Sequence, residues 1–180
     1  DLSNFYFEKV ENFSYLFFSC NNLKSLKLSP KTINKVKFFN NTFANCTQLE
    51  SIDLTAINMS SIINMSYMFS DCVQLKTIEF SKSENRYNII EMNNTFANCI
   101  SLSSLDLSFI YADGNINLNQ CFSNCTSLKE INIINLKTTE SQNTYNFLEN
   151  VSLERCLYHS NDNVNNGNSL TNKYCQQYKS

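Results

Sequence analysis

The 180-residue sequence predicts a solenoid in which short parallel strands stack from one coil to the next. Three observations predict it. A cysteine recurs every 26 or 27 residues, with an aromatic residue three positions before it and a leucine three positions after it. The heptapeptide NNTFANC occurs twice, at residues 40–46 and 93–99, which lie two repeats apart. A fixed period of this length with a leucine pattern is typical of leucine-rich repeat solenoids.

The repeat reads F-x-x-C-x-x-L-x-x-[LI]-x-[LFI] and occurs five times in register. Its last positions alternate between apolar and polar residues, which predicts one short strand per coil with one face inward. Equivalent strands in successive coils are expected to stack about 4.8 Å apart as a parallel sheet. The aromatic residues are expected to form one continuous buried column: Phe17, Phe43, Phe69, Phe96 and Phe122.

The rest of each coil carries a short connection and a second alternation. A segment such as NMSYMFSDC, at residues 64–72, is too short for a long helix and is expected to form one or two helical turns. Asn45, Asp71, Asn98 and Asn124 are expected to end these turns, because Asn and Asp tolerate a left-handed backbone. The return side predicts a second short strand, with these inward pairs: Ile63 and Met65, Ile90 and Met92, and Ile116 and Leu118.

We divide the chain into an N-terminal cap (residues 1–12), five leucine-rich coils (residues 13–144), and a degenerate repeat with a C-terminal cap and polar tail (residues 145–180). A single coil buries too little apolar surface to offset the conformational entropy lost on ordering it. The coils are therefore expected to be stable only when stacked, and the two ends need covers. The apolar segment at residues 5–13 fits the N-terminal cover.

The composition argues against two classes of partner. A formal net charge of −2 gives no general attraction for nucleic acid. No run of about 18 apolar residues is present, so no segment is expected to span a membrane. Eight cysteines in a chain of this size favour an oxidising compartment.

The five repeat cysteines are expected to pack as small apolar residues, one in each coil. The sequence has no C-x-x-C pair and no histidine near the repeat cysteines, so it indicates neither a metal site nor a cofactor. Cys121 takes a position that Leu, Thr and Met hold in the other coils, so it is expected in the core. Cys156 and Cys175 bracket the polar tail and are candidates for a disulfide that stabilises the C-terminal cap.

Catalysis is not indicated by any motif. His159 is the single histidine, in a cap segment, where a lone histidine is more often structural than catalytic. The sequence has no Ser-His-Asp set, no phosphate-binding loop and no H-E-x-x-H motif. We expect a protein that is not an enzyme.

The outward face of the strands is the first candidate binding surface. One outward position per coil gives the candidate residues Lys27, Asp53, Glu79, Asp106 and Asn132. The three acidic residues among them would stand in one row and repel one another, so a cation or a basic partner would relieve them. The alternative is a solvated polar face. Aromatic residues, which dominate protein-binding hot spots, are missing from this face, and this argues against tight protein recognition there.

Residues 24–37 contain five lysines and no acidic residue, all on the first coil. They are either a basic docking patch or a guard of lysines that protects an edge strand from strand addition. A basic first coil and acidic middle coils would also attract head to tail. Contacts of that kind build filaments when they do not close into a ring.

The N-x-[ST] acceptor pattern for N-linked glycans occurs eight times. In a secreted eukaryotic protein several of these sites would carry glycans. Outward positions of the return half hold Asn58, Asn64 and Asn93, whereas Asn45 and Asn124 are expected to end turns beside core cysteines. The full set of candidates is Asn12, Asn40, Asn45, Asn58, Asn64, Asn93, Asn124 and Asn150.

The segments NMSYMFSDCVQLKTIEF and MNNTFANCISLSSLDLS resemble the M-x-x-M-F-x-x-C-x-x-L-x-x-L-D-L-S repeat of BspA-like leucine-rich surface proteins. The resemblance covers residues 13–155. It implies a secreted or surface-anchored protein associated with adhesion, and the family brings no catalytic motif. This sequence departs from the pattern with Thr in place of the second Met in two repeats and with a loose last repeat.

We therefore expect an extracellular or cell-surface module for adhesion or for binding of a protein or glycan. One alternative is a structural subunit whose copies assemble head to tail into an extracellular filament or coat. A second alternative is an intracellular scaffold, which would fit eight reduced cysteines.

Overall fold

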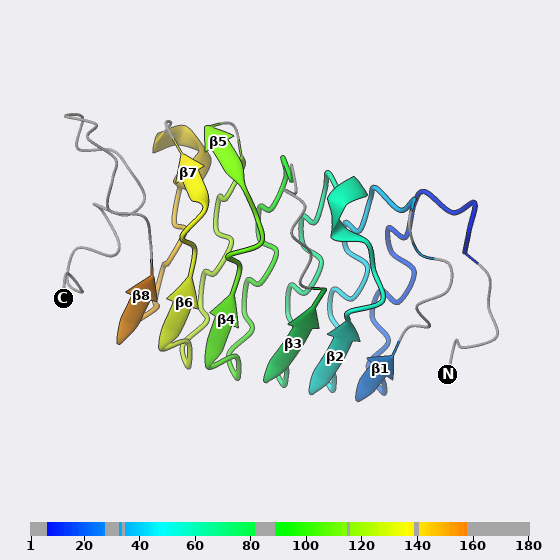
Figure 1. The fold of residues 1–180 in the computed structure, drawn as a ribbon. Helices are drawn as coiled ribbons and strands as arrows, with labels where there is room; N and C mark the ends of the chain where they lie inside the picture. Colours follow the sequence, from blue (N-terminus) through cyan, green and yellow to red (C-terminus); the bar gives the residue numbers. More distant parts are fainter. Residues whose placement is uncertain are drawn as a thin grey trace.

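The computed structural model describes residues 7–27, 33, 35–81, 89–114, 116–138 and 141–157. The chain winds into a parallel β-solenoid with coils of about 26 residues and almost no helix. Figure 1 shows the strands of one face standing side by side in chain order. They are β1 (Ser25–Lys27), β2 (Ser51–Leu54), β3 (Thr77–Phe80), β4 (Ser104–Asp106), β6 (Glu130–Asn132) and β8 (Arg155–Leu157).

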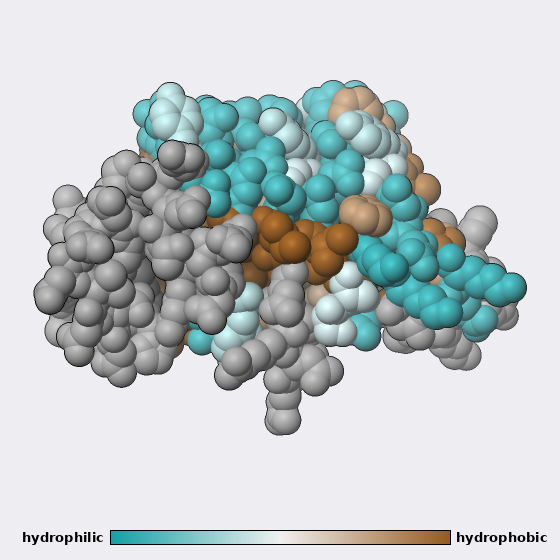
Figure 2. Space-filling model, turned by 90° about the horizontal axis from the view of Figure 1, so that it is seen from above, coloured by the Kyte–Doolittle hydropathy of each residue, from teal (hydrophilic) through white to brown (hydrophobic). Residues whose placement is uncertain are grey.

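The remaining elements lie at the other end of the coils. They are the 3-10 helices η1 (Met59–Ser61) and η2 (Ser141–Thr144) and the strands β5 (Ala112–Gly114) and β7 (Leu136–Thr138), which pair in parallel. Figure 2 views this end from above; its coloured surface is mainly hydrophilic, with an apolar patch near the centre.

The predicted strands and their register are confirmed. Leu26 pairs with Ile52 and Ile52 with Ile78, while Leu105 pairs with Ile131 in the next sheet. The inward residues fill the interior, so one continuous apolar core runs along the described coils. The second predicted strand is reduced to single bridged residues that form one ladder: Asn12, Phe38, Asn64, Glu91 and Asn117.

On the return side the prediction is confirmed for four of the six inward residues, Met65, Met92, Ile116 and Leu118, but Ile63 and Ile90 are not buried. Ile90 is 52% exposed, whereas Ile89 and Ile62 are buried. The predicted pairing of Ile90 with Met92 is therefore wrong on the isoleucine side. Strict alternation fails here because a single bridged residue does not continue the two-residue period of a strand.

The predicted helical turns are not confirmed; each of these segments is a run of β-turns. In the third coil the Cys72 amide donates to the Phe69 carbonyl at 3.1 Å, and Asp71 has a φ of 62°. A positive φ at the third turn residue is what a type II turn requires. The same conformation recurs in six coils, at Ser19, Asn45, Asp71, Asn98, Asn124 and Asn150.

Alternate amides in this segment leave the coil. The Phe69 amide donates to the Thr95 carbonyl of the next coil at 2.8 Å, and the Asp71 amide donates to the Ala97 carbonyl at 2.8 Å. An α-helix would need all of these amides for its own carbonyls. The coil-to-coil bonds therefore exclude a helix here.

The residues that end the turns also bond to one another through their side chains. Asn98 Nδ2 donates to Asp71 Oδ1 at 2.7 Å, and Asn124 Nδ2 donates to Asn98 Oδ1 at 2.9 Å. Asn150 continues the series onto Asn124 at 2.6 Å, and Asn45 Nδ2 reaches Ser19 Oγ at 3.0 Å. We call this column the asparagine ladder. The prediction that these residues end the turns is confirmed, although the turns are not helical.

The predicted aromatic column is confirmed. The rings of Phe17, Phe43, Phe69, Phe96 and Phe122 stack with centroids 5.1–5.8 Å apart and planes within 12° of parallel. Phe147 closes the column edge-on against Phe122 at 5.3 Å. Each ring is therefore covered on both faces once it lies inside the stack, which explains why single coils need neighbours.

The repeat cysteines form a second column beside the rings. The Cys72 thiol donates to the Phe43 carbonyl at 3.1 Å, and the Cys99 thiol donates to the Phe69 carbonyl at 3.1 Å. Cys121 is fully buried, as predicted. Cys20 is exposed, contrary to the prediction for repeat cysteines, because no earlier described coil covers it.

Burial controls the acidity of these thiols. Desolvation raises the pKa of Cys46 to about 11 and that of Cys125 to about 12. The thiols of Cys72, Cys99 and Cys121 also have raised pKa values for the same reason. The buried thiols of the column are therefore neutral at physiological pH.

We expect the substitution Phe69→Ala to lower the free energy of unfolding by about 3–5 kcal/mol, because it opens a cavity in the middle of the column. The control is Tyr145→Ala, whose ring is 64% exposed and whose loss should change stability by about 0.5 kcal/mol or less. Urea unfolding followed by circular dichroism measures both. Equal effects of the two substitutions would contradict the column.

We expect Asn98→Ala to destabilise the protein by about 2–3 kcal/mol, since it removes two side-chain hydrogen bonds and leaves a Cβ atom on a left-handed residue. Asn98→Gly removes the same bonds but accepts the positive φ, so it should be about 1 kcal/mol more stable than Asn98→Ala. Thermal and urea unfolding give the comparison. If the two variants are equally stable, the backbone conformation contributes nothing.

The raised thiol pKa values also predict a loss of stability in alkali. An unfolded cysteine ionises near pH 8.5, so below that pH both states are neutral and the thiol contribution is fully present. Between about pH 9 and pH 11 the unfolded state gains thiolates first, and the free energy of unfolding falls. Replacing Cys125 with Ser should make this fall shallower by up to about 1.4 kcal/mol per pH unit. An unchanged slope between pH 9 and pH 11 in urea titrations would argue against a buried neutral Cys125.

Candidate binding groove

The parallel sheet is interrupted in the middle of the molecule. The strand order is β1-β2-β3 in one sheet and β4-β6-β8 in the next, so β3 and β4 each end a sheet where they face one another. Figure 1 shows the wider separation between these two strands. Within the described residues, the facing edges of β3 and β4 therefore have no neighbouring strand to pair with.

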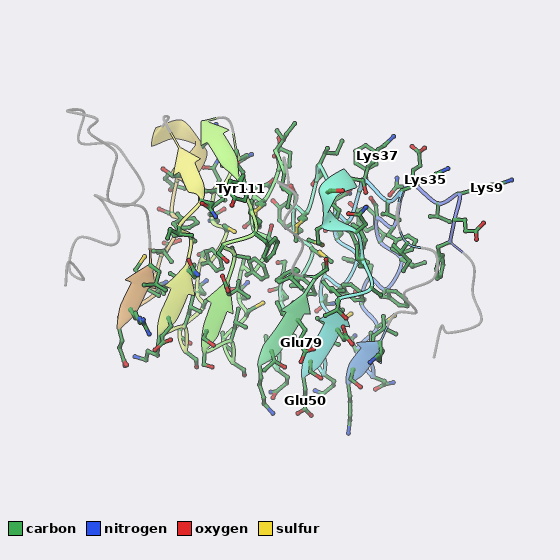
Figure 3. The ribbon with its side chains drawn as sticks, in the orientation of Figure 1. Lys9, Lys35, Lys37, Glu50, Glu79 and Tyr111 are labelled. Carbon is green, nitrogen blue, oxygen red and sulfur yellow. The ribbon has the colours of Figure 1, made fainter. Side chains whose placement is uncertain are left out.

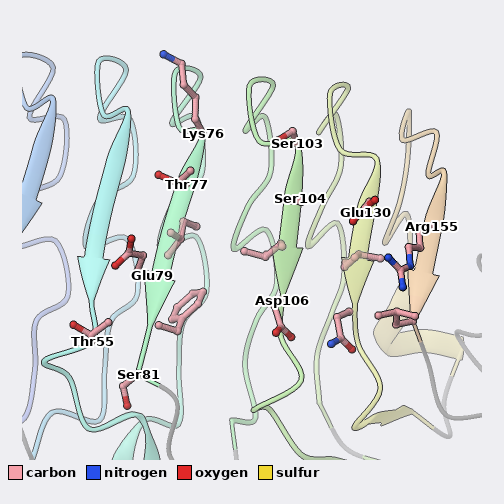
Figure 4. Close-up of a pocket in the computed structure, with 16 residues that line it drawn as sticks. Thr55, Lys76, Thr77, Glu79, Ser81, Ser103, Ser104, Asp106, Glu130 and Arg155 are labelled. Atoms are coloured by element: carbon pink, nitrogen blue, oxygen red, sulfur yellow. The ribbon is translucent and has the colours of Figure 1, made fainter.

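A groove of about 890 Å³ opens at this interruption (Figure 4). Its apolar lining comes from Ile78 and Phe80 on β3, Leu105 on β4 and Ile131 on β6. Ile78 is half-buried, whereas Ile52, its neighbour on β2, is only 2% exposed. The gap thus gives partial access to Ile78, whereas Phe80, Leu105 and Ile131 remain buried.

An aromatic pair occupies the inner end of the gap. Phe80 takes the column position of Leu54 and Leu107, and its ring lies 4.8 Å from that of Phe109 at an angle of 45°. A phenylalanine is bulkier than the leucines on either side of it. This larger pair is a physical reason for the wider separation of the two coils.

Charged residues surround the apolar lining. Figure 4 shows Glu79 on β3, Asp106 on β4, and Glu130 and Arg155 on β6 and β8. Lys76 lies at the upper end, and its Nζ atom bonds to Glu50 at 2.9 Å. Within the described residues, no ion pair neutralises Glu79, Asp106 or Glu130. Among the described lining residues, the three carboxylates outnumber the one cation that forms no ion pair, Arg155, which stands in register with Glu130, so their net charge is negative.

Of the five residues that the sequence proposed for this face, three line the groove and two do not. Glu79, Asp106 and Asn132 line the groove. Lys27 and Asp53 lie outside it and form an ion pair of 3.3 Å. The predicted acidic row holds between Asp53 and Glu79, which are paired in register, but the groove separates Glu79 from Asp106.

Local contacts stabilise the ionised form of the Asp53 carboxyl. The Thr55 hydroxyl and amide donate to its Oδ1 atom, and together with Lys27 they lower the pKa of this carboxyl. Asp106 makes the equivalent turn contact, accepting the Ser108 amide at 2.9 Å, but no lysine among the described residues forms an ion pair with it. The two aspartates differ in neighbours rather than in local backbone role.

Sequence reasoning missed three parts of the groove. Ile78 and Phe80 were assigned to the core, and Arg155 lies in the degenerate repeat, where the period gives no register. The available signals were a phenylalanine at a leucine position and the single 27-residue spacing, which lies between Cys72 and Cys99. Because Phe80 belongs to the lining, the groove is not entirely without an aromatic residue.

The described ranges contain no group of three or more His, Cys, Asp or Glu side chains arranged to hold a metal ion. No helix within them has the length and apolar character of a membrane span. Cys156 is buried and is not one of the free thiols. Cys175 and His159 lie outside the described residues, so the predicted Cys156–Cys175 disulfide stays a prediction.

The glycan acceptor candidates fall into two groups. The side-chain nitrogens of Asn45, Asn124 and Asn150 donate within the asparagine ladder. In the other five residues the side-chain oxygen accepts a hydrogen bond from a nearby serine: Asn12, Asn40, Asn58, Asn64 and Asn93. Asn58 is exposed at the start of η1, where its oxygen accepts the Ser60 amide.

Residues 1–105 match a sequence family that is described as "Mycoplasma protein of unknown function, DUF285". No curated protein and no solved structure gives a match. The matched segment is more than half of the 180 residues and includes the first three strands, the groove wall on β3 and most of β4. The chain therefore belongs to the DUF285 family.

Proposed function

We propose that this chain is a non-catalytic binding module of a cell-surface or secreted protein, a leucine-rich repeat solenoid of the BspA-like type. Its ligand is an extended, positively charged polypeptide segment held in the groove between β3 and β4. The observation that carries the proposal is the interruption of the sheet, which leaves two strand edges and an apolar lining open on an otherwise regular face.

The free strand edges support a polypeptide ligand. An extended peptide offers main-chain donors and acceptors to an unpaired edge, and alternate side chains point to opposite sides. Ile78, half-buried on the β3 wall, gives apolar contact for an inward side chain. A glycan fits this groove less well, because Phe80 is only 8% exposed and no open aromatic face lines it.

The charge of the groove supports a cationic ligand. Glu79, Asp106 and Glu130 lie along it without an ion pair, and Lys76 already bonds to Glu50. A lysine or arginine side chain outside the apolar contacts would meet these carboxylates. Complementary charge of this kind raises the association rate and selects against acidic partners.

The surface location rests on the sequence. Eight cysteines, the family resemblance and the glycan acceptor pattern all favour an extracellular setting. Adhesion is then the use of the groove that fits best, since a surface module that holds an exposed strand of another protein attaches one surface to another.

We expect a fluorescein-labelled decapeptide of alternating Val and Lys to bind, and its Val–Glu counterpart not to bind. The substitution Asp106→Asn should weaken binding of the Val–Lys peptide about tenfold, since one favourable charge pair of about 1.4 kcal/mol is lost. Fluorescence anisotropy at low salt measures the dissociation constants, and added salt should weaken binding further.

The matched control is Asp53→Asn. This aspartate accepts the same turn hydrogen bond but lies outside the groove, so the affinity should stay within twofold of the unchanged protein. The proposal fails if both peptides bind equally, if neither binds, or if Asp53→Asn and Asp106→Asn have the same effect. Tighter binding of a soluble oligosaccharide than of the Val–Lys peptide would point to a glycan ligand.

A further inference from the structure

The turn segments of the middle coils present one residue per coil in a straight row, which we call the turn row. Its members are Asn41, Tyr67, Asn94 and Gln120, and their φ values lie between 53° and 58°. Each main-chain amide of the row donates to the following coil; the Tyr67 amide, for example, donates to the Asn93 carbonyl at 3.0 Å. Each main-chain carbonyl of the row closes a turn in its own coil. Only the side chains of the row are therefore available to a partner.

The amide side chains of the turn row are not used inside the described part of the molecule. Asn41, Asn94 and Gln120 are half-buried, and no hydrogen bond joins their side chains to any other described residue. The asparagine ladder differs, because Asn98 and Asn124 bond there from coil to coil. Each amide side chain of the row therefore keeps two donors and one acceptor oxygen for a ligand.

Tyr67 is the aromatic member of the turn row, and it is 39% exposed. Its φ is 58°, a left-handed conformation that is unfavourable for a bulky residue. Asparagine, which tolerates this conformation, holds the position in the coils on both sides. The chain thus keeps an exposed ring where asparagine would be more stable, and strain of this kind is concentrated at functional sites.

The turn segments that carry the row are nearly free of charge. Residues 39–46, 65–72, 92–99 and 118–125 contain one charged residue, Asp71. Its carboxylate accepts hydrogen bonds from Asn98 at 2.7 Å and from Ser70 at 2.9 Å. Figure 3 shows where the labelled charged residues lie: Glu79 on β3, Glu50 at the lower end of the coils, and Lys9, Lys35 and Lys37 at the upper end near the first coils. A ligand of the turn row is therefore expected to be neutral.

The spacing of the turn row matches an extended glycan. Coils joined by this backbone bonding repeat about every 4.8 Å. An unbranched chain of β-1,4-linked pyranoses advances by nearly the same distance for each sugar, so that one sugar lies over each coil. A peptide strand advances about 3.3 Å per residue and falls out of step with the row. The apolar face of a sugar packs on an aromatic ring, and its hydroxyls donate to and accept from side-chain amides.

We propose that the turn row binds an unbranched, neutral β-1,4-linked glycan. One sugar stacks on Tyr67, the sugars on either side bond to Asn41 and Asn94, and Gln120 bonds to the next sugar along. None of these four residues lines the groove between β3 and β4. The inference is therefore independent of the peptide ligand proposed above.

The test is a titration of the whole chain with cellopentaose, followed by calorimetry and by two-dimensional NMR of the side-chain amides. We expect cellopentaose to shift the amide signals of Asn41, Asn94 and Gln120. Maltopentaose contains the same sugar in α-1,4 linkages that curve the chain, so it should shift none of them. Tyr67→Asn introduces the residue of the neighbouring coils, so the variant should fold, yet it should bind cellopentaose about tenfold more weakly. Asn94→Gly accepts the positive φ but lacks the amide, and should weaken binding about fivefold.

The matched control is Tyr111→Asn. Tyr111 is 36% exposed, close to the value for Tyr67, but it precedes β5 at the upper end of the coils (Figure 3) and lies outside the row. This variant should bind cellopentaose as the unchanged protein does, and circular dichroism verifies that every variant is folded. Tyr67→Asn should leave binding of the Val–Lys peptide unchanged, and Asp106→Asn should leave binding of cellopentaose unchanged, so that the two sites are tested separately.

The proposal is overturned if cellopentaose does not bind, or if maltopentaose shifts the same amide signals equally. It is also overturned if Tyr67→Asn binds cellopentaose as tightly as the unchanged protein, or if Tyr111→Asn or Asp106→Asn weakens binding as much as Tyr67→Asn does.

Discussion

In the turn segments, backbone amides donate alternately to a carbonyl of their own coil and to a carbonyl of the next coil. The rest of the molecule depends on this alternation. The Ser70 amide closes a turn onto Tyr67, while the Phe69 amide crosses to Thr95 in the next coil. This alternation fixes each coil at the spacing of one strand, about 4.8 Å. Equivalent residues then lie directly above one another. Aromatic rings, thiols and side-chain amides form columns as a result.

The same constraint selects the residue types. Two positions per coil have a positive φ, which glycine adopts most easily, yet the chain has only two glycines. Asparagine and aspartate serve at most of these positions, and at one position their side chains also bond from coil to coil. Thr42 and Thr95 are fully buried, and each has its hydroxyl within hydrogen-bond distance of a carbonyl three residues earlier. A polar residue is tolerated there because the turn supplies an acceptor.

The groups that can contact a partner are concentrated where the regular coil-to-coil hydrogen bonding stops. Inside the stack, main-chain groups and apolar side chains are already used, and the outer face is polar. At the interruption between β3 and β4, the walls keep strand edges, apolar side chains and unpaired carboxylates together. A repeat protein without a catalytic motif thus gains specific surfaces from its irregularities.

The sequence by itself determined the period, the strand register, the phenylalanine column, the buried Cys121 and the turn-ending Asn98, because a fixed spacing encodes which residues stack. It did not separate a helical turn from a β-turn run, since both begin with short-range amide bonds and only contact with the next coil decides. Only the tertiary structure showed that β3 and β4 part, because that depends on how Phe80 packs against Phe109 across coils. The place of Arg155 in the groove was likewise decided by packing, since the degenerate repeat carries no period from which to read its register.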